Sequence, residues 1–208
     1  MAGMRHALTA IALLAAPAAG IAATLDVTVR DAAGKPVRDA VVTVVSAAGK
    51  PAAPPRFAWP ARVTQQDISF DPYVLIVPVG AVVAFPNKDK VRHHVYSFSK
   101  AKKFDLKLYG RDESRSVTFD KAGPVALGCN IHDGMTAFVQ VVDTPWAAKS
   151  DAAGRVSLAG LPAGPAKIRV WHPYARVKNN EVVLAVSLPA SGTTARAVSL
   201  ALAPGHRH

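Results

Sequence analysis

The sequence predicts an all-β fold on two observations. Short runs of alternating or β-branched residues recur along the chain, and Gly, Pro, Asn and Asp separate them. After residue 23, no long stretch repeats its apolar residues at the spacing of an amphipathic helix. Many short strands with turns between them are typical of sandwiches and barrels. We expect strands at 25–29, 40–45, 74–79, 81–85, 94–98, 116–119, 136–142, 166–171 and 182–186.

The N-terminal segment 1–23 has the pattern of a secretory signal peptide. Arg5 precedes an apolar run at 7–19, and small residues follow that run. We therefore expect cleavage after Ala22 or Ala23 and a periplasmic location, with an uncleaved N-terminal anchor as the alternative. No later apolar run is long enough to cross a bilayer, so we expect no stable membrane span after cleavage.

The chain is basic, with 25 Lys and Arg against 14 Asp and Glu, and part of this charge is concentrated near two histidines. Between residues 87 and 107, seven basic residues face only Asp89 and Asp105, a net charge of +5. We expect this charge to surround His93 and attract an acidic partner, and a solvated basic surface is the alternative. We expect no nucleic-acid partner, because the chain is predicted to be exported and has no recognisable nucleic-acid-binding motif. The basic residues are Lys88, Lys90, Arg92, Lys100, Lys102, Lys103 and Lys107.

The chain has one cysteine, Cys129, which cannot form a disulfide within the chain. A lone cysteine in an exported protein indicates pairing with another chain, a reactive thiol or a metal ligand. His132 and Met135 follow Cys129 at the spacing C-x2-H-x2-M, which favours the ligand. A thiolate, imidazoles and a weak axial thioether are the donor set of a type 1, or blue, copper centre. The second imidazole would come from His93 or His94, whose side chains alternate across a strand.

Two distant segments share one turn pattern, Asp-Ala-Ala-Gly followed by a basic residue, at 31–35 and 151–155. Each predicts a tight turn with its glycine at positive φ. With their flanking strands, the segments 24–50 and 145–203 resemble the two halves of a carboxypeptidase-regulatory-like, transthyretin-type β-sandwich. We expect one discontinuous, smaller sandwich, interrupted at a loop by a second domain. Two tandem domains are the alternative, and 204–208 would form a tail.

The intervening segment 57–143 resembles the cupredoxins, and most of all the plastocyanin-like proteins of methylamine utilisation. The matching motifs are Phe70-x-Pro72, Val79-Gly80-x-x-Val83-x-Phe85-x-Asn87, Phe119-x-x-x-Gly123 and Leu127-Gly128-Cys129. The resemblance implies a Greek-key sandwich that holds one type 1 copper ion at one end. It also implies that the upstream ligand lies six residues after Asn87, which selects His93 over His94. The implied ligands are His93, Cys129, His132 and Met135.

These features predict an exported blue copper protein that carries single electrons between periplasmic redox partners. The expected partner is acidic, such as a c-type cytochrome or a periplasmic dehydrogenase. We expect no enzyme activity, because four protein ligands leave no open position for a substrate. The main alternative is a periplasmic copper chaperone or copper-resistance protein with the same ligands. A module that binds carbohydrate or envelope protein and an enzyme with an open copper site are further alternatives.

Overall fold

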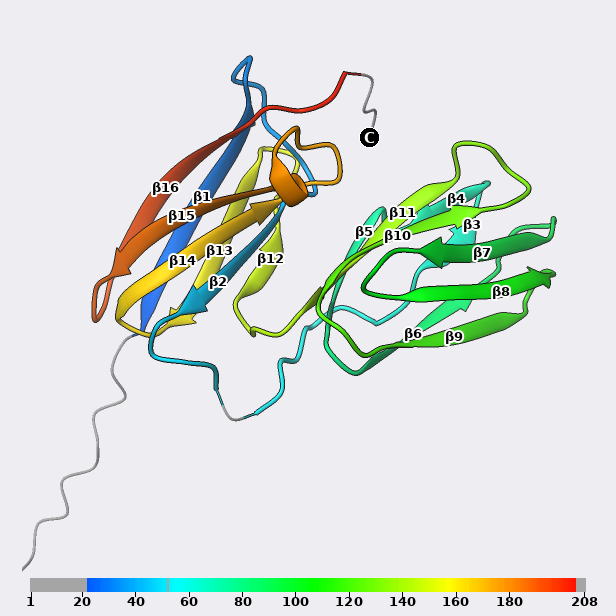
Figure 1. The fold of residues 1–208 in the computed structure, drawn as a ribbon, viewed down its shortest axis with the longest axis horizontal. Helices are drawn as coiled ribbons and strands as arrows, with labels where there is room; N and C mark the ends of the chain where they lie inside the picture. The colour runs from blue at the N-terminus through cyan, green and yellow to red at the C-terminus, as the bar shows by residue number, and fades with distance from the viewer. Residues whose placement is uncertain (1–21, 52, 205–208) are drawn as a thin grey trace, which may run out of the picture.

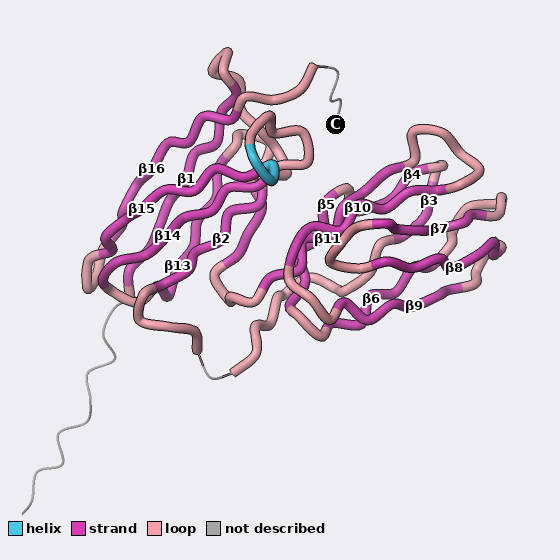
Figure 2. Tube along the Cα trace, in the orientation of Figure 1, coloured by secondary structure: helices cyan, strands magenta, loops and turns pink. Residues whose placement is uncertain are grey.

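The protein is built almost entirely from β-strands, as Figures 1 and 2 show for the computed structural model. This model describes residues 22–51 and 53–204. Within them the helical structure is one short 3-10 turn, Lys178–Asn180, and no helix is long and apolar enough to cross a membrane. The predicted all-β fold is confirmed. The predicted signal peptide (1–23) and tail (204–208) lie outside the described residues except for 22, 23 and 204.

One group of strands, here called the terminal unit, is drawn from both ends of the chain. A three-stranded sheet has the order β13-β1-β16, and a four-stranded sheet has the order β12-β2-β14-β15. Aliphatic residues of both sheets form one core cluster, which includes Leu25, Ile168 and Leu200. The strands are β1 (Ala23–Asp31), β2 (Val41–Ser46), β12 (Ala147–Lys149), β13 (Arg155–Leu161), β14 (Gly164–Trp171), β15 (Glu181–Leu188) and β16 (Thr193–Leu200).

The two similar turns of the terminal unit are built alike. Asp31 Oδ1 accepts hydrogen bonds from the backbone N–H groups two and four residues further on, at 2.9 and 2.8 Å. Asp151 Oδ1 does the same at 2.9 and 2.8 Å. Gly34 and Gly154 take φ of +79° and +74°, which a side chain would disfavour. The repeated sequence pattern therefore marks two equivalent turns.

The other strands form the central unit, which carries the cysteine motif. Its five-stranded sheet has the order β5-β11-β10-β7-β8, and two further strand pairs complete it. A second core cluster fills this unit and includes Phe85, Tyr109 and Cys129. The strands are β3 (Thr64–Gln66), β4 (Ser69–Asp71), β5 (Val74–Pro78), β6 (Ala81–Pro86), β7 (His93–Phe98), β8 (Lys103–Tyr109), β9 (Ser114–Phe119), β10 (Gly123–Cys129) and β11 (Thr136–Val142).

The two units meet in a small apolar cluster. Val74 and Ile76 of β5 contribute to it from the central unit, and Trp171 of β14 contributes from the terminal unit. The rings of Phe138 and Trp171 contact edge to face, with centroids 5.8 Å apart. Lys149 Nζ donates a hydrogen bond to Val74 O at 3.2 Å across the same junction. These contacts hold one end of the central unit and leave its other end free (Figure 1).

Candidate metal centre

Strand β7 places His93 inside the central unit and His94 outside it. Side chains alternate along a strand, and the burial of β7 alternates accordingly. The His93 side chain is fully buried, whereas His94 is partly exposed and contacts Asp105 Oδ1 through Nε2 at 2.5 Å. The geometry therefore brings His93, and not His94, towards the cysteine motif.

Strand β10 carries Cys129 to the same end of the sheet. Cys129 lies opposite Val95 of β7, which puts its side chain two positions from His93 along the neighbouring strand. The residues after it form a compact loop, in which Cys129 N–H donates to Met135 O and Met135 N–H donates to His132 O, both at 3.3 Å. A further bond, Asn130 N–H to His94 O at 3.2 Å, ties this loop to β7. His132 is thereby folded back over Cys129.

Three donor atoms converge at this point. His93 Nδ1 lies 3.1 Å from His132 Nδ1, and Cys129 Sγ lies 3.8 and 3.6 Å from these two nitrogens. A first-row metal ion binds imidazole nitrogen at about 2.0 Å and thiolate sulfur at about 2.3 Å, so donors closer than about 4.3 Å can share one ion. One thiolate and two imidazoles suit copper. The residues present therefore fit a single copper ion.

The fourth predicted ligand, Met135, lies in the same loop. Its side chain is buried in the core cluster that also contains Cys129. Its backbone closes the loop through the two hydrogen bonds described above. Its role as the weak axial ligand stays a prediction.

Behind His93 lies a carboxylate that the sequence analysis treated only as a charge. Asp89 Oδ2 lies 2.7 Å from His93 Nε2, on the opposite side of the ring from Cys129. Burial raises the pKa of the Asp89 carboxyl, but hydrogen bonds from His93 and from the backbone N–H groups of Ile68 and Asp67 outweigh it and lower this pKa below its usual value. In the sequence, the only sign of this contact is that Asp89 precedes His93 by four residues. The contact itself depends on the loop conformation.

That loop, 87–93, is held by a buried amide. Asn87 Nδ2 donates to Val91 O at 2.9 Å and to Tyr109 O at 3.3 Å, and its Oδ1 accepts from Asp89 N–H at 2.9 Å. Below it, Tyr109 donates its hydroxyl hydrogen to Phe85 O at 2.9 Å, and burial raises the pKa of Tyr109 to about 12. The phenol is therefore neutral near pH 7. The hydrogen bonds of Asn87 and Tyr109 hold the loop that carries His93 in place.

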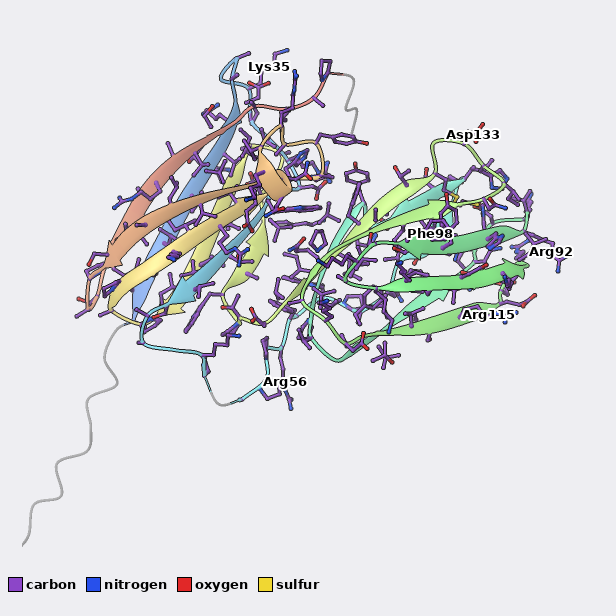
Figure 3. All side chains as sticks on the ribbon, viewed as in Figure 1. Lys35, Arg56, Arg92, Phe98, Arg115 and Asp133 are labelled. Atoms are coloured by element: carbon purple, nitrogen blue, oxygen red, sulfur yellow. The ribbon has the colours of Figure 1, made fainter. Side chains whose placement is uncertain are left out.

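The basic residues do not all surround His93, which corrects the sequence expectation. Lys100, Lys102 and Lys103 follow β7, and five residues of extended strand separate the two ends of β7 by about 17 Å. Figure 3 shows Arg92 and Asp133 at the end of the central unit that points away from the terminal unit. Phe98 lies nearer the junction in the same view. The charge of the segment 87–107 is therefore divided between two ends of one sheet.

No family model matches this chain, and no curated protein matches it. Solved structures resemble part of it. The copper-containing nitrite reductase NirK from Thermus scotoductus SA-01 is 28% identical, with a TM-score of 0.39, and the match covers 44% of this chain and 25% of the reductase. This chain thus spans a quarter of the reductase's length.

Two smaller proteins are matched over nearly their whole length. A purple cupredoxin from Nitrosopumilus maritimus is 21% identical, with a TM-score of 0.36, and the match covers 39% of this chain and 99% of that protein. An amicyanin variant, in a reduced Cu(I) form, is 22% identical, with a TM-score of 0.37, and the match covers 49% of this chain and 98% of amicyanin. These neighbours are cupredoxins, the family that the sequence resembles.

Proposed function

We propose that this protein is an exported type 1 copper protein that carries single electrons between periplasmic redox partners. The observation that carries the proposal is the convergence of His93 Nδ1, His132 Nδ1 and Cys129 Sγ within 4.8 Å of one another. A bound copper ion would supply a one-electron Cu(II)/Cu(I) couple at this position. The proposed ligands are His93, Cys129 and His132, with Met135 as the weak axial ligand.

The surrounding residues fix the donors before any metal binds. His93 is held by Asp89 from behind, and Cys129 and His132 are held by the backbone bonds of one short loop. Cys129 ends β10, His132 lies in the loop that follows it and His93 lies on β7, so the site depends on the folded sheet. A preformed donor set needs little rearrangement when the charge of its ion changes by one. This property suits an electron carrier.

His132 is the proposed port for electrons. His93 is fully buried and Cys129 is buried, whereas His132 is partly exposed. Asp133 and Ile131 beside it are exposed, and half of the Ile131 surface is accessible. A partner docked over this loop would approach the donors through the His132 ring. Lys90 and Arg92, which are exposed at the same end, would favour an acidic partner such as a c-type cytochrome or a periplasmic dehydrogenase.

The alternative is a copper chaperone or copper-resistance protein with the same ligands. Such proteins exchange their copper with partners, which requires accessible donors. The burial of His93 and Cys129 favours a resident ion instead. We propose that the protein is not an enzyme, because a fourth protein ligand would leave no position for a substrate.

The visible and EPR spectra of the Cu(II)-loaded mature protein test this proposal, with Cys129→Ser as the variant. We expect an intense absorption band near about 600 nm and narrow copper hyperfine splitting, both lost in Cys129→Ser. His94→Ala is the matched control and should keep the band, because His94 points away from the cluster. A colourless loaded protein, or a spectrum unchanged in Cys129→Ser, would contradict the proposal.

A further inference from the structure

The strongest unassigned feature near the cluster is the position of Asp89. Its carboxylate faces His93 Nε2 at 2.7 Å, and its side chain is 11% exposed. It also accepts hydrogen bonds from two consecutive backbone N–H groups, those of Asp67 to Oδ1 at 2.6 Å and of Ile68 to Oδ2 at 3.1 Å. The carboxylate therefore lies between the His93 ring and the turn that joins β3 to β4.

The turn is a two-residue hairpin that presents two N–H groups to the carboxylate. Asp67 and Ile68 both take positive φ, at 54° and 52°, which aims their N–H groups to the same side. Positive φ is unfavourable for a β-branched residue such as Ile68 and persists only where the surrounding structure fixes it. Both N–H groups can only donate, so Asp89 must accept from them with its two oxygens. The backbone thus fixes Asp89 independently of His93.

This arrangement determines which nitrogen of His93 carries the hydrogen. Asp89 accepts at Nε2, so the neutral ring has its hydrogen on Nε2 and a bare lone pair on Nδ1. Nδ1 is the atom that faces Cys129 Sγ and His132 Nδ1. A carboxylate bonded to the far side of a ligating imidazole also makes that imidazole a stronger donor.

We propose that Asp89 is a positioning residue of the metal centre: it holds His93 in the Nε2–H form and favours Cu(II) over Cu(I), which lowers the reduction potential. The first part concerns the protein alone. The second part rests on the copper function proposed above. A negative charge behind one ligand stabilises the more positive oxidation state, so its removal should raise the potential.

The variant Asp89→Asn tests both parts. An amide has one acceptor oxygen, so it cannot accept from Asp67 N–H, Ile68 N–H and His93 Nε2–H as the two carboxylate oxygens do. It also removes the negative charge while keeping the side-chain size. The matched control is Asp112→Asn, which removes the same charge from a side chain that is 65% exposed and pairs with Lys88.

The first measurement is the 15N spectrum of the His93 ring in the metal-free mature protein, recorded at a pH where the spectrum itself shows a neutral ring. We expect a protonated Nε2 and a bare Nδ1 in the unmodified protein and in Asp112→Asn. Asp89→Asn should show a mixture of both forms. A hydrogen on Nδ1 in the unmodified protein would overturn the proposal, whether or not the variant folds.

The second measurement is the reduction potential of the copper-loaded proteins. Loss of an outer-shell partner typically weakens metal binding about 10- to 100-fold. A tenfold loss of Cu(II) affinity relative to Cu(I) raises the potential by about 59 mV. We expect at least this rise for Asp89→Asn and a smaller one for Asp112→Asn.

The outcomes separate this proposal from the copper function. If the chain binds no copper, the copper function fails, and the NMR result alone decides whether Asp89 positions His93. If Asp89→Asn lowers the melting temperature but leaves the tautomer and the potential unchanged, Asp89 is only structural and the proposal is wrong. Equal shifts in Asp89→Asn and Asp112→Asn would also overturn it, because they would show a general charge effect.

Discussion

Buried polar groups bond to the backbone in both the terminal and the central unit, but the central unit also holds three donor side chains that face one another. In the terminal unit, buried Ser150 bonds to backbone groups, accepting from Ala40 N–H at 2.9 Å and donating to Val37 O at 2.7 Å. In the central unit, His93, Cys129 and His132 direct their donor atoms at one another. A buried polar group that pairs with backbone is explained by folding. Donors that converge on one point could hold a metal ion, and this difference is why we propose the metal site in the central unit.

The largest expected effect is a difference in copper binding between alanine variants of two adjacent histidines, His93 and His94. His93→Ala should abolish the blue band. Loss of an outer-shell partner typically weakens metal binding about 10- to 100-fold, and we expect the loss of the ligand His93 to weaken Cu(II) binding more than that. His94→Ala should leave both unchanged, because its ring lies on the other face of β7. Copper titrations followed by absorption check this pair. Equal losses in the two variants would break the assignment of His93.

A cavity in the terminal core should affect stability without affecting the metal centre. Ile168 is fully buried there, and Ile168→Ala should lower the free energy of unfolding by about 2–5 kcal/mol. The visible spectrum of the loaded, folded variant should stay the same, because Ile168 belongs to the other core cluster. Denaturant titration and the spectrum check this together. A shifted copper band in the folded variant would show that the two units are coupled.

The two similar turns of the terminal unit offer a matched pair. A Cβ at Gly34 would contact no atom within 4 Å, whereas one at Gly154 would lie 2.3 Å from Val29 O. Both alanine variants incur the cost of positive φ, about 1–2 kcal/mol. We expect Gly154→Ala to cost at least about 1 kcal/mol more than Gly34→Ala, because the backbone must move. Thermal unfolding of the two variants measures the difference, and equal stabilities would contradict the described packing.

The smallest expected effect is a difference in reduction rate between variants of basic residues at the two ends of β7. At low salt, Arg92→Ala should slow reduction of the loaded protein by the anion hexacyanoferrate(II) about two- to threefold. Lys103→Ala should slow it less, because Lys103 lies about 17 Å further along the sheet. Stopped-flow rates at low and high salt measure both, and salt should reduce the difference. A larger effect from Lys103 would place the docking surface at the other end.

Local patterns in the sequence predicted much of the fold, and together with the family resemblance they selected His93, Cys129 and His132, which the structure brings together. The alternation of β7 separates His93 from His94, and the spacing after Cys129 brings back His132. Strands β8 and β16, in which charged and small residues interrupt the apolar pattern, were not among the expected strands, and neither were the three-residue strands β3, β4 and β12.

Features that depend on distant segments could not be predicted. The Asp89 carboxylate is held beside His93 by a turn between β3 and β4, which local sequence does not reveal. The lysines after β7 are near His93 in sequence but not in space, because an extended strand separates them. The sequence indicated the candidate donors, whereas the tertiary structure decides what surrounds them.

The most direct test of an electron carrier is a reversible redox cycle of the copper-loaded protein with a Cu(I) chelator present. We expect one electron per protein, full recovery of the visible band after each cycle, and one copper ion retained throughout. The buried donors His93 and Cys129 are the reason to expect retention in both oxidation states. Loss of copper to the chelator on reduction would contradict the proposed function and favour a copper chaperone.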